Sequence, residues 1–211
     1  MVSKVLSGVE GRSRTMTNNQ KIGVALVLSV VGWALWATGK YWLADIHYAG
    51  GQKNYQFFQK TQDTQYLTSS FQSFQSAVKL NSTEPAILSE YAVSMAYIAV
   101  ILAPQDATSA GLLANSAATL ADKAVSLSPH HPNYYKSAAR VYILLSDLPS
   151  AAKVLTQAAQ VSPTDPRLPY NLGLIYESLG QSDLARKAYE RSLSLKPDLQ
   201  DAKKQLEVML K

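Results

Sequence analysis

The sequence predicts an all-α protein in which one membrane-spanning helix precedes a right-handed solenoid of about four helix pairs and a C-terminal capping helix. Two observations lead to this prediction. An uncharged apolar run lies near the N-terminus, and side chains of the same kind then recur every 34 residues. Self-similarity at a period of roughly 20 to 50 residues is typical of solenoids, because each unit buries its apolar face only against its neighbours.

The uncharged run covers residues 22–39 and reads IGVALVLSVVGWALWATG. At about 1.5 Å per residue, a helix of this length extends roughly 27 Å, close to the ~30 Å hydrocarbon thickness of a bilayer. Trp33 and Trp36 lie in its C-terminal half, where amphipathic rings favour the membrane interface. The sequence therefore predicts a basic N-terminal flank at residues 1–21 and a transmembrane helix at residues 22–43.

Two alternatives remain open for this run. It can be a cleaved signal peptide, because Gly32-Trp33-Ala34 resembles a small-residue cleavage site, although the apolar stretch is longer than a usual signal core. It can also be a buried helix of a globular domain, although it has no polar face to turn toward water.

The charge distribution indicates the membrane topology and bears on nucleic-acid binding. The chain carries 20 Lys and Arg against 15 Asp and Glu, and five basic residues and one acidic residue precede Tyr41. Since most of the excess positive charge flanks the apolar run, the positive-inside rule predicts that the N-terminus is cytoplasmic and that the rest of the chain is extracytoplasmic. The remainder is almost neutral, which argues against nucleic-acid binding. The absence of cysteine excludes a thiol nucleophile and a Cys-ligated metal site.

The repeats have a period of 34 residues, at which prolines and alanines recur: Pro129, Pro163 and Pro197, and Ala117, Ala151 and Ala185. Further prolines at half-period steps, such as Pro149 and Pro166, mark helix starts, since proline is tolerated in the first helical turn. Asp147 and Asp165 precede these prolines and are suited to cap the helices. Each unit is therefore predicted to be two helices joined by a short turn.

The repeat domain is predicted to cover residues 44–211. Its parts are repeats at about 44–84, 85–131, 132–165 and 166–199 and a capping helix at 199–210. The second repeat has about 13 extra residues by comparison with the period, which we place around Leu102 to Ala110 with a lengthened first helix. Gly50-Gly51 is expected to form a hinge between the anchor and the repeats.

Residues 166–199 resemble the tetratricopeptide repeat. They match its pattern at a leucine-glycine pair, two aromatic positions, a turn glycine, a small residue and a closing proline: Leu172, Gly173, Tyr176, Gly180, Ala185, Tyr189 and Pro197. They depart from it at Pro169 and Ser192. The resemblance implies a solenoid in which the first helix of each unit lines a concave groove that binds partner proteins.

A narrower resemblance extends over nearly the whole chain. The span running into YWLADIHYAGG, the segment LNSTEPAILSEYAVSMAYIAVIL and the segment PTDPRLPYNLGLIYESLGQ are similar to the C-terminal part of bacterial O-antigen ligase and polymerase family proteins. Those proteins carry many preceding membrane helices that form the glycan-transfer site. The resemblance therefore implies a role in surface-polysaccharide assembly without supplying an activity.

The candidate partner-binding groove is formed by the first helices of the last two repeats. Its expected members are Asn133, Lys136, Arg140, Arg167, Tyr170, Asn171, Leu174 and Glu177. Its three cations suit a carboxylate or an acidic peptide, whereas an ordinary solvated face is the alternative. Within the resemblance, Lys136 and Asn171 match a carboxylate-binding set, but Arg140 stands in place of an asparagine. In the second repeat, Ala86, Ser89, Val93 and Ala96 are expected to give a smoother apolar stretch of the same groove.

No residue pattern predicts catalysis, and we expect no metal and no cofactor. His47 stands alone, and the adjacent His130 and His131 have no Asp, Glu or Cys at ligand spacing. The sequence therefore predicts a non-catalytic, membrane-anchored scaffold that binds a partner protein in a membrane-associated complex and contacts the bilayer through residues 22–43. The alternatives are an auxiliary or detached module of an O-antigen ligase or polymerase and, after signal cleavage, a secreted repeat protein.

Overall fold

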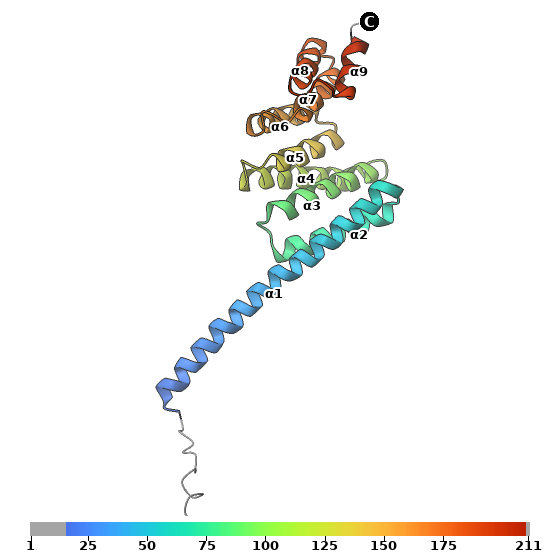
Figure 1. Cartoon of the computed structure of the whole chain (residues 1–211). Helices are drawn as coiled ribbons and strands as arrows, with labels where there is room; N and C mark the ends of the chain where they lie inside the picture. The colour runs from blue at the N-terminus through green and yellow to red at the C-terminus, as the bar shows by residue number, and fades with distance from the viewer. Residues whose placement is uncertain (1–15, 210–211) are drawn as a thin grey trace, which may run out of the picture. The chain divides into compact units, whose positions relative to one another are not determined.

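The computed structural model describes residues 16–209, which form nine α-helices and no strand (Figure 1). The helices are α1 (Asn18–Thr61), α2 (Thr64–Leu80), α3 (Pro85–Leu102), α4 (Ala107–Leu127), α5 (Pro132–Leu144), α6 (Leu148–Val161), α7 (Arg167–Ser178), α8 (Ser182–Leu195) and α9 (Gln200–Met209). The all-α prediction is confirmed for this range. Most of the predicted basic flank and the last residue of the predicted capping helix lie outside the described residues. The chain divides into two compact units, residues 1–41 and 42–211.

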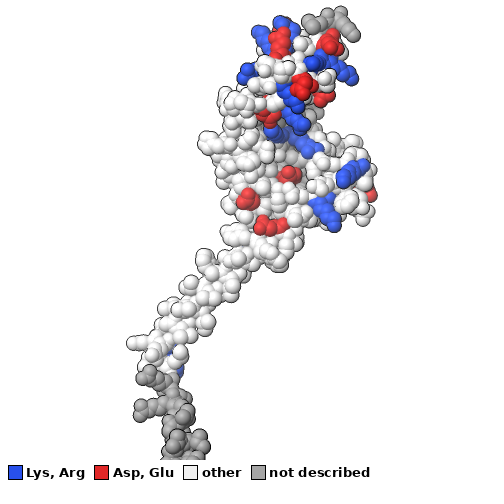
Figure 2. All heavy atoms as spheres, viewed as in Figure 1, with Lys and Arg blue, Asp and Glu red and all other residues white. Residues whose placement is uncertain are grey.

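The described part of the first unit is the N-terminal part of α1, and Figure 2 shows almost no charged side chain on its visible face. Every residue from Ile22 to Trp36 is exposed, and Leu28 retains 65% of its accessible surface. The hydroxyls of Ser29 and Thr38 donate to the carbonyl oxygens four residues earlier, at 2.8 Å each. Because these side chains are satisfied inside the helix, the segment needs no polar partner from its surroundings.

The second unit is a solenoid in which helices that follow one another in the chain pack as pairs. In Figure 1, α3 lies against α4, α5 against α6, and α7 against α8, while α9 packs on α8. The core between the pairs consists largely of small side chains, which let helices approach closely. The buried alanines include Ala92, Ala96, Ala117, Ala121, Ala138, Ala139, Ala151, Ala158 and Ala185.

Side-chain caps and one left-handed glycine set the ends of the helices. Asp147 accepts a hydrogen bond from the backbone N–H of Ser150 at 3.1 Å, which confirms the predicted cap of α6. Asp165 accepts from the N–H of Arg167 at 3.0 Å at the start of α7. Gly180 follows α7 with φ +70°, a backbone conformation that glycine adopts without a steric penalty.

The extra residues of the second repeat lengthen both of its helices. Helices α3 and α4 have 18 and 21 residues, whereas α5 and α6 have 13 and 14. The prediction of a lengthened first helix is therefore incomplete, because α4 gains more than α3. The reason is the cap at Asp106, which accepts from the N–H of Ser109 at 3.0 Å and starts α4 directly after a short turn.

The predicted hinge at Gly50-Gly51 is wrong, because α1 is helical through both residues. Gly51 is buried against the ring of Phe74 on α2, and a Cβ atom at this position would lie 2.5 Å from that ring. The hydroxyl of Ser70 also donates to the Gly51 carbonyl at 2.9 Å. The missing side chain therefore allows α2 to pack closely on α1.

We predict that Gly51→Ala lowers the free energy of unfolding by about 1–3 kcal/mol, because the new methyl group overpacks a closed helix contact. Gly50→Ala is the matched control. Its Cβ would have only the Ser73 hydroxyl oxygen nearby, at 4.0 Å, so the better helix propensity of alanine should leave stability unchanged or raised. Denaturant unfolding followed by circular dichroism measures both, and equal effects of the two substitutions would contradict this packing.

Candidate functional site

The second unit contains a pocket of about 230 Å³ that is lined mainly by polar and charged side chains. We call it the polar pocket, and its lining residues are Gln52, Tyr55, Gln56, Gln59, Glu90 and Arg140. They come from α1, α3 and α5, the first helices of three successive pairs. The pocket therefore lies on the set of helices that the sequence predicts to line the binding groove.

Arg140 is held in the polar pocket by two tyrosines. Its guanidinium carbon lies 5.4 Å from the ring centroid of Tyr55 and 5.6 Å from that of Tyr97. One guanidinium N–H donates to the Tyr97 hydroxyl at 3.0 Å. Because a guanidinium is attracted to the faces of aromatic rings, these contacts fix the side chain of α5 against α1 and α3.

Glu90 places a carboxylate in the same pocket. Burial raises the pKa of Glu90, and the nearby positive charge of Arg140 partly offsets this by lowering it. The ion pairs of the described residues are Lys136–Asp165 and Arg186–Glu190, so Glu90 and Arg140 influence each other without direct contact. The pocket thus offers one acidic and one basic group to a ligand.

The hydroxyl of Tyr55 is the third notable group. Tyr55 is only 6% exposed, and its hydroxyl is the one buried side-chain polar atom among the described residues that forms no hydrogen bond. Gln59 and Tyr97 lie beside it without hydrogen-bond geometry, and burial raises its pKa. A buried polar group without a partner costs about 1–3 kcal/mol, so this hydroxyl lowers the stability of the fold.

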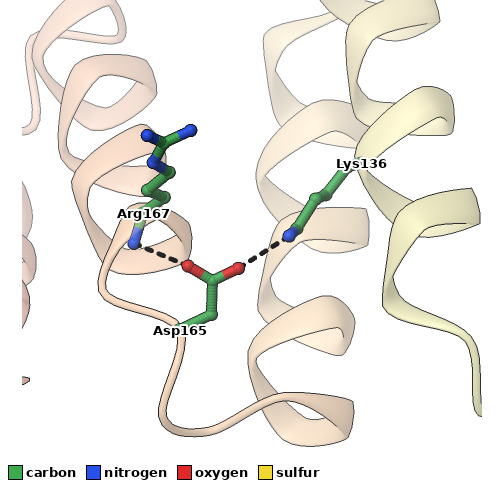
Figure 3. A network of polar contacts seen from close by, with 3 residues as sticks. All are labelled: Lys136, Asp165 and Arg167. Atoms are coloured by element: carbon green, nitrogen blue, oxygen red, sulfur yellow. Dashed lines mark hydrogen bonds and ion pairs between the residues drawn. The ribbon is translucent and has the colours of Figure 1, made fainter.

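Lys136 and the backbone of Arg167 both contact the carboxylate of Asp165, which forms a second polar cluster (Figure 3). The Lys136 ammonium lies 2.6 Å from Oδ2 of Asp165, whose Oδ1 accepts from the Arg167 N–H. Burial raises the pKa of Asp165, but the hydrogen bonds from Lys136 and Arg167 lower it by more. The pKa of Asp165 is therefore below its ordinary value. The charge of Lys136 is therefore used to join α5 to the start of α7.

The other predicted groove residues lie on α5 and α7. Glu177 accepts from the Tyr189 hydroxyl at 2.7 Å, and Tyr170 has its ring 6.0 Å from that of Tyr189. Asn133 is exposed, while Asn171 and Leu174 are half-buried. Arg140 thus contacts two tyrosines and Lys136 pairs with Asp165, whereas the side chain of Arg167 is exposed.

The sequence prediction missed most of the polar pocket. On α3, three of the residues expected to face the groove, Ser89, Val93 and Ala96, are buried in the core, and Glu90 lines the pocket instead. A signal was present on α1, where Gln52, Gln56 and Gln59 have the i, i+4, i+7 spacing of one helix face. Their position opposite Arg140 depends on packing between distant residues.

Comparison with known proteins supports the tetratricopeptide prediction. Residues 167–199 match the family model of the tetratricopeptide repeat, whereas a comparison with curated protein sequences finds no match. A MamA structure is 19% identical with a TM-score of 0.59, covering 79% of this chain and 80% of that one. MamA of Desulfovibrio magneticus RS-1 is 19% identical with a TM-score of 0.53, covering 76% of this chain and 83% of that one. PilF of Pseudomonas aeruginosa is 15% identical with a TM-score of 0.59, covering 82% of this chain and 69% of that one. At these identities the similarity shows the fold alone, a solenoid of the tetratricopeptide type.

We predict that Asp165→Ala lowers the free energy of unfolding by about 1–2 kcal/mol, because it removes a helix cap together with the partner of Lys136. The pKa of Asp165 is lowered in the folded protein. The stabilisation by its ionised carboxylate is therefore fully present above pH 3.8, the ordinary pKa of the group, and is lost as the pH falls through the lower pKa of the folded state. The difference between wild type and variant should therefore shrink in acid. Asp198→Ala, at an exposed position, is the control, and a pH-independent difference would contradict the prediction.

We further predict opposite effects for two buried tyrosines. Tyr55→Phe removes a hydroxyl without a partner and should raise the free energy of unfolding by about 1 kcal/mol. Tyr189→Phe removes the hydroxyl that donates to Glu177 and should lower it by a similar amount. Thermal unfolding of both variants measures the contrast, and destabilisation by Tyr55→Phe would indicate that its hydroxyl is already satisfied.

Proposed function

We propose that this protein is a non-catalytic, membrane-anchored scaffold whose solenoid binds a partner protein in a membrane-associated complex. The observation that carries the proposal is the polar pocket, which places Glu90 and Arg140 together on the first helices of successive pairs. Beyond the pocket, the proposed contact surface continues over Asn133, Lys136, Arg140, Arg167, Tyr170, Asn171, Leu174 and Glu177. A peptide lying along these helices would meet polar side chains on α1, α3, α5 and α7 in turn.

The proposed anchor is the transmembrane helix at residues 22–43. Two helices among the described residues are long and apolar enough to cross a membrane, α1 and α3. The most apolar stretch of α1 is 0% buried, whereas 56% of that of α3 is buried in the solenoid core. The ammonium of Lys40 lies 5.8 Å from the ring centroid of Trp36, an arrangement suited to the membrane interface. We place the N-terminus in the cytoplasm and the solenoid outside it, by the positive-inside rule.

We predict that Leu28→Arg combined with Val31→Arg releases the protein from the membrane fraction, since each arginine near the centre of a span costs about 2.5–3.5 kcal/mol. The control is Leu112→Arg combined with Val100→Arg in the solenoid. Leu28 and Leu112 are matched, with 65% and 66% of their surfaces exposed. Alkaline extraction of membranes followed by immunoblotting measures the retained fraction. Extraction of the wild type would contradict the anchor, as would equal release of both double variants.

We predict that Arg140→Gln reduces partner recovery at least tenfold when the full chain is affinity-purified from detergent-solubilised membranes. The substitution removes the charge that the two tyrosines position, and truncating one buried charged contact costs 2–5 kcal/mol in typical interfaces. Arg191→Gln, at an exposed position on α8, is the control. Quantitative mass spectrometry of proteins recovered with each variant is the measurement, and the same partner at wild-type yield from Arg140→Gln would contradict a role for the pocket.

The alternative function is an auxiliary or detached module of an O-antigen ligase or polymerase type of surface-glycan assembly protein. It is supported by the sequence resemblance to that family over the span and the repeats. One of the segments that carry this resemblance is PTDPRLPYNLGLIYESLGQ. Genomic neighbours test it, because flippase and glycosyltransferase genes beside this one favour the glycan role, and their absence favours the general scaffold.

A further inference from the structure

We propose that the polar pocket selects an uncharged amide side chain, glutamine or asparagine, from the peptide segment of the partner. This inference rests on the proposed function, since it names the residue class that the partner presents to the groove. It differs from the carboxylate expected from the cations of the sequence, because a carboxylate and a guanidinium line the pocket together.

The charges of the pocket disfavour charged ligands of either sign. Glu90 and Arg140 both line a space of about 230 Å³ without neutralising each other by direct contact. A ligand carboxylate attracted to Arg140 meets the repulsion of Glu90, and a ligand ammonium attracted to Glu90 meets that of Arg140. Like charges brought together in a partly buried site are costly, so both charged ligands bind less favourably than a neutral one.

Hydrogen bonding disfavours an apolar ligand. An apolar side chain would displace water from Glu90 and from Arg140, and each buried polar group left without a partner costs about 1–3 kcal/mol. A carboxamide avoids this cost because it combines two N–H donors with a carbonyl acceptor. Its donors suit the Glu90 carboxylate and its acceptor suits the guanidinium of Arg140.

The glutamines of α1 complete the match to an amide. Gln52, Gln56 and Gln59 lie on one face of the helix, and each carries a donor and an acceptor. Gln52 already uses one N–H, which donates to the Tyr48 hydroxyl at 2.8 Å. Amide groups pair with other amides through complementary donors and acceptors, and the ligand itself carries no charge that must lose its hydration shell.

The size of the pocket limits what enters it. Liquid water takes up about 30 Å³ per molecule, so the pocket corresponds to roughly seven or eight waters. It is smaller than the 300–1,000 Å³ that is usual for pockets of cofactors and drug-sized ligands. It is large enough for the five heavy atoms of a glutamine side chain with part of the adjoining main chain, which favours one residue of a peptide over a whole small molecule.

The test uses the full chain in detergent micelles and saturation-transfer NMR on four probes: the N-acetyl methylamides of glutamine, glutamate, lysine and leucine. We expect the glutamine probe to bind about tenfold more tightly than each of the others, the equivalent of one buried hydrogen bond. Empty micelles correct for partitioning. Equal or tighter binding of any other probe, or no binding of the glutamine probe, overturns the inference.

Charge variants give a second, independent readout. Glu90→Gln removes the repulsion on anions and should raise the affinity of the glutamate probe at least tenfold. Arg140→Gln should do the same for the lysine probe, which keeps the inference testable if one variant does not fold. Glu207→Gln, on the exposed face of α9, is the matched control and should leave the ranking of the probes unchanged. A folded pocket variant with the wild-type ranking overturns the inference.

Partner recovery separates this inference from the proposed function. If the wild-type chain recovers a partner but the probes show no amide preference, the inference falls and the scaffold function stands. If the amide preference is present but no partner is recovered, the pocket is a selective site and the scaffold function falls.

Discussion

The solenoid depends on close packing between helices whose contact residues have little or no side chain. Phe74 fits beside Gly51, and the ring of Tyr189 occupies the space that a side chain on Gly173 would take. Alanines play the same role between the other pairs. Because these contacts bring successive first helices side by side, residues from α1, α3 and α5 share one pocket. The polar pocket is thus a consequence of packing, and a bulkier contact residue would disturb it from a distance.

The fold was largely predictable from the sequence, because it depends on local and periodic signals. Prolines at a fixed step, the cap at Asp147 and the turn glycine Gly180 act within a few residues of their position. Errors arose where a local signal is ambiguous. The pair Gly50-Gly51 predicts flexibility when taken alone, and only the presence of Phe74 on another helix shows that Gly51 is a packing contact. Similarly, the Asp106 cap determines that α4 receives part of the insertion.

The site was less predictable, since it combines side chains that are distant in the chain. Arg140 was identified from its helix position, but its partners Tyr55 and Tyr97 are more than 40 residues away. A list of cations on a helix face suggests an anion site, whereas the structure pairs Lys136 with Asp165 and sets Arg140 beside Glu90. The net charge of the pocket is therefore small, and the recognition that we propose depends on hydrogen bonds more than on attraction between opposite charges.

The central claim is that a partner protein occupies the polar pocket in the cell, and site-specific photo-crosslinking tests it most directly. A photoreactive phenylalanine derivative replaces either Gln56, which is an exposed residue of the pocket, or Gln157, which is an exposed residue of α6 outside the pocket. We expect illumination of living cells to yield a discrete higher-mass adduct from position 56 and none from position 157. Adducts from both positions in equal yield, or from position 157 alone, would contradict it.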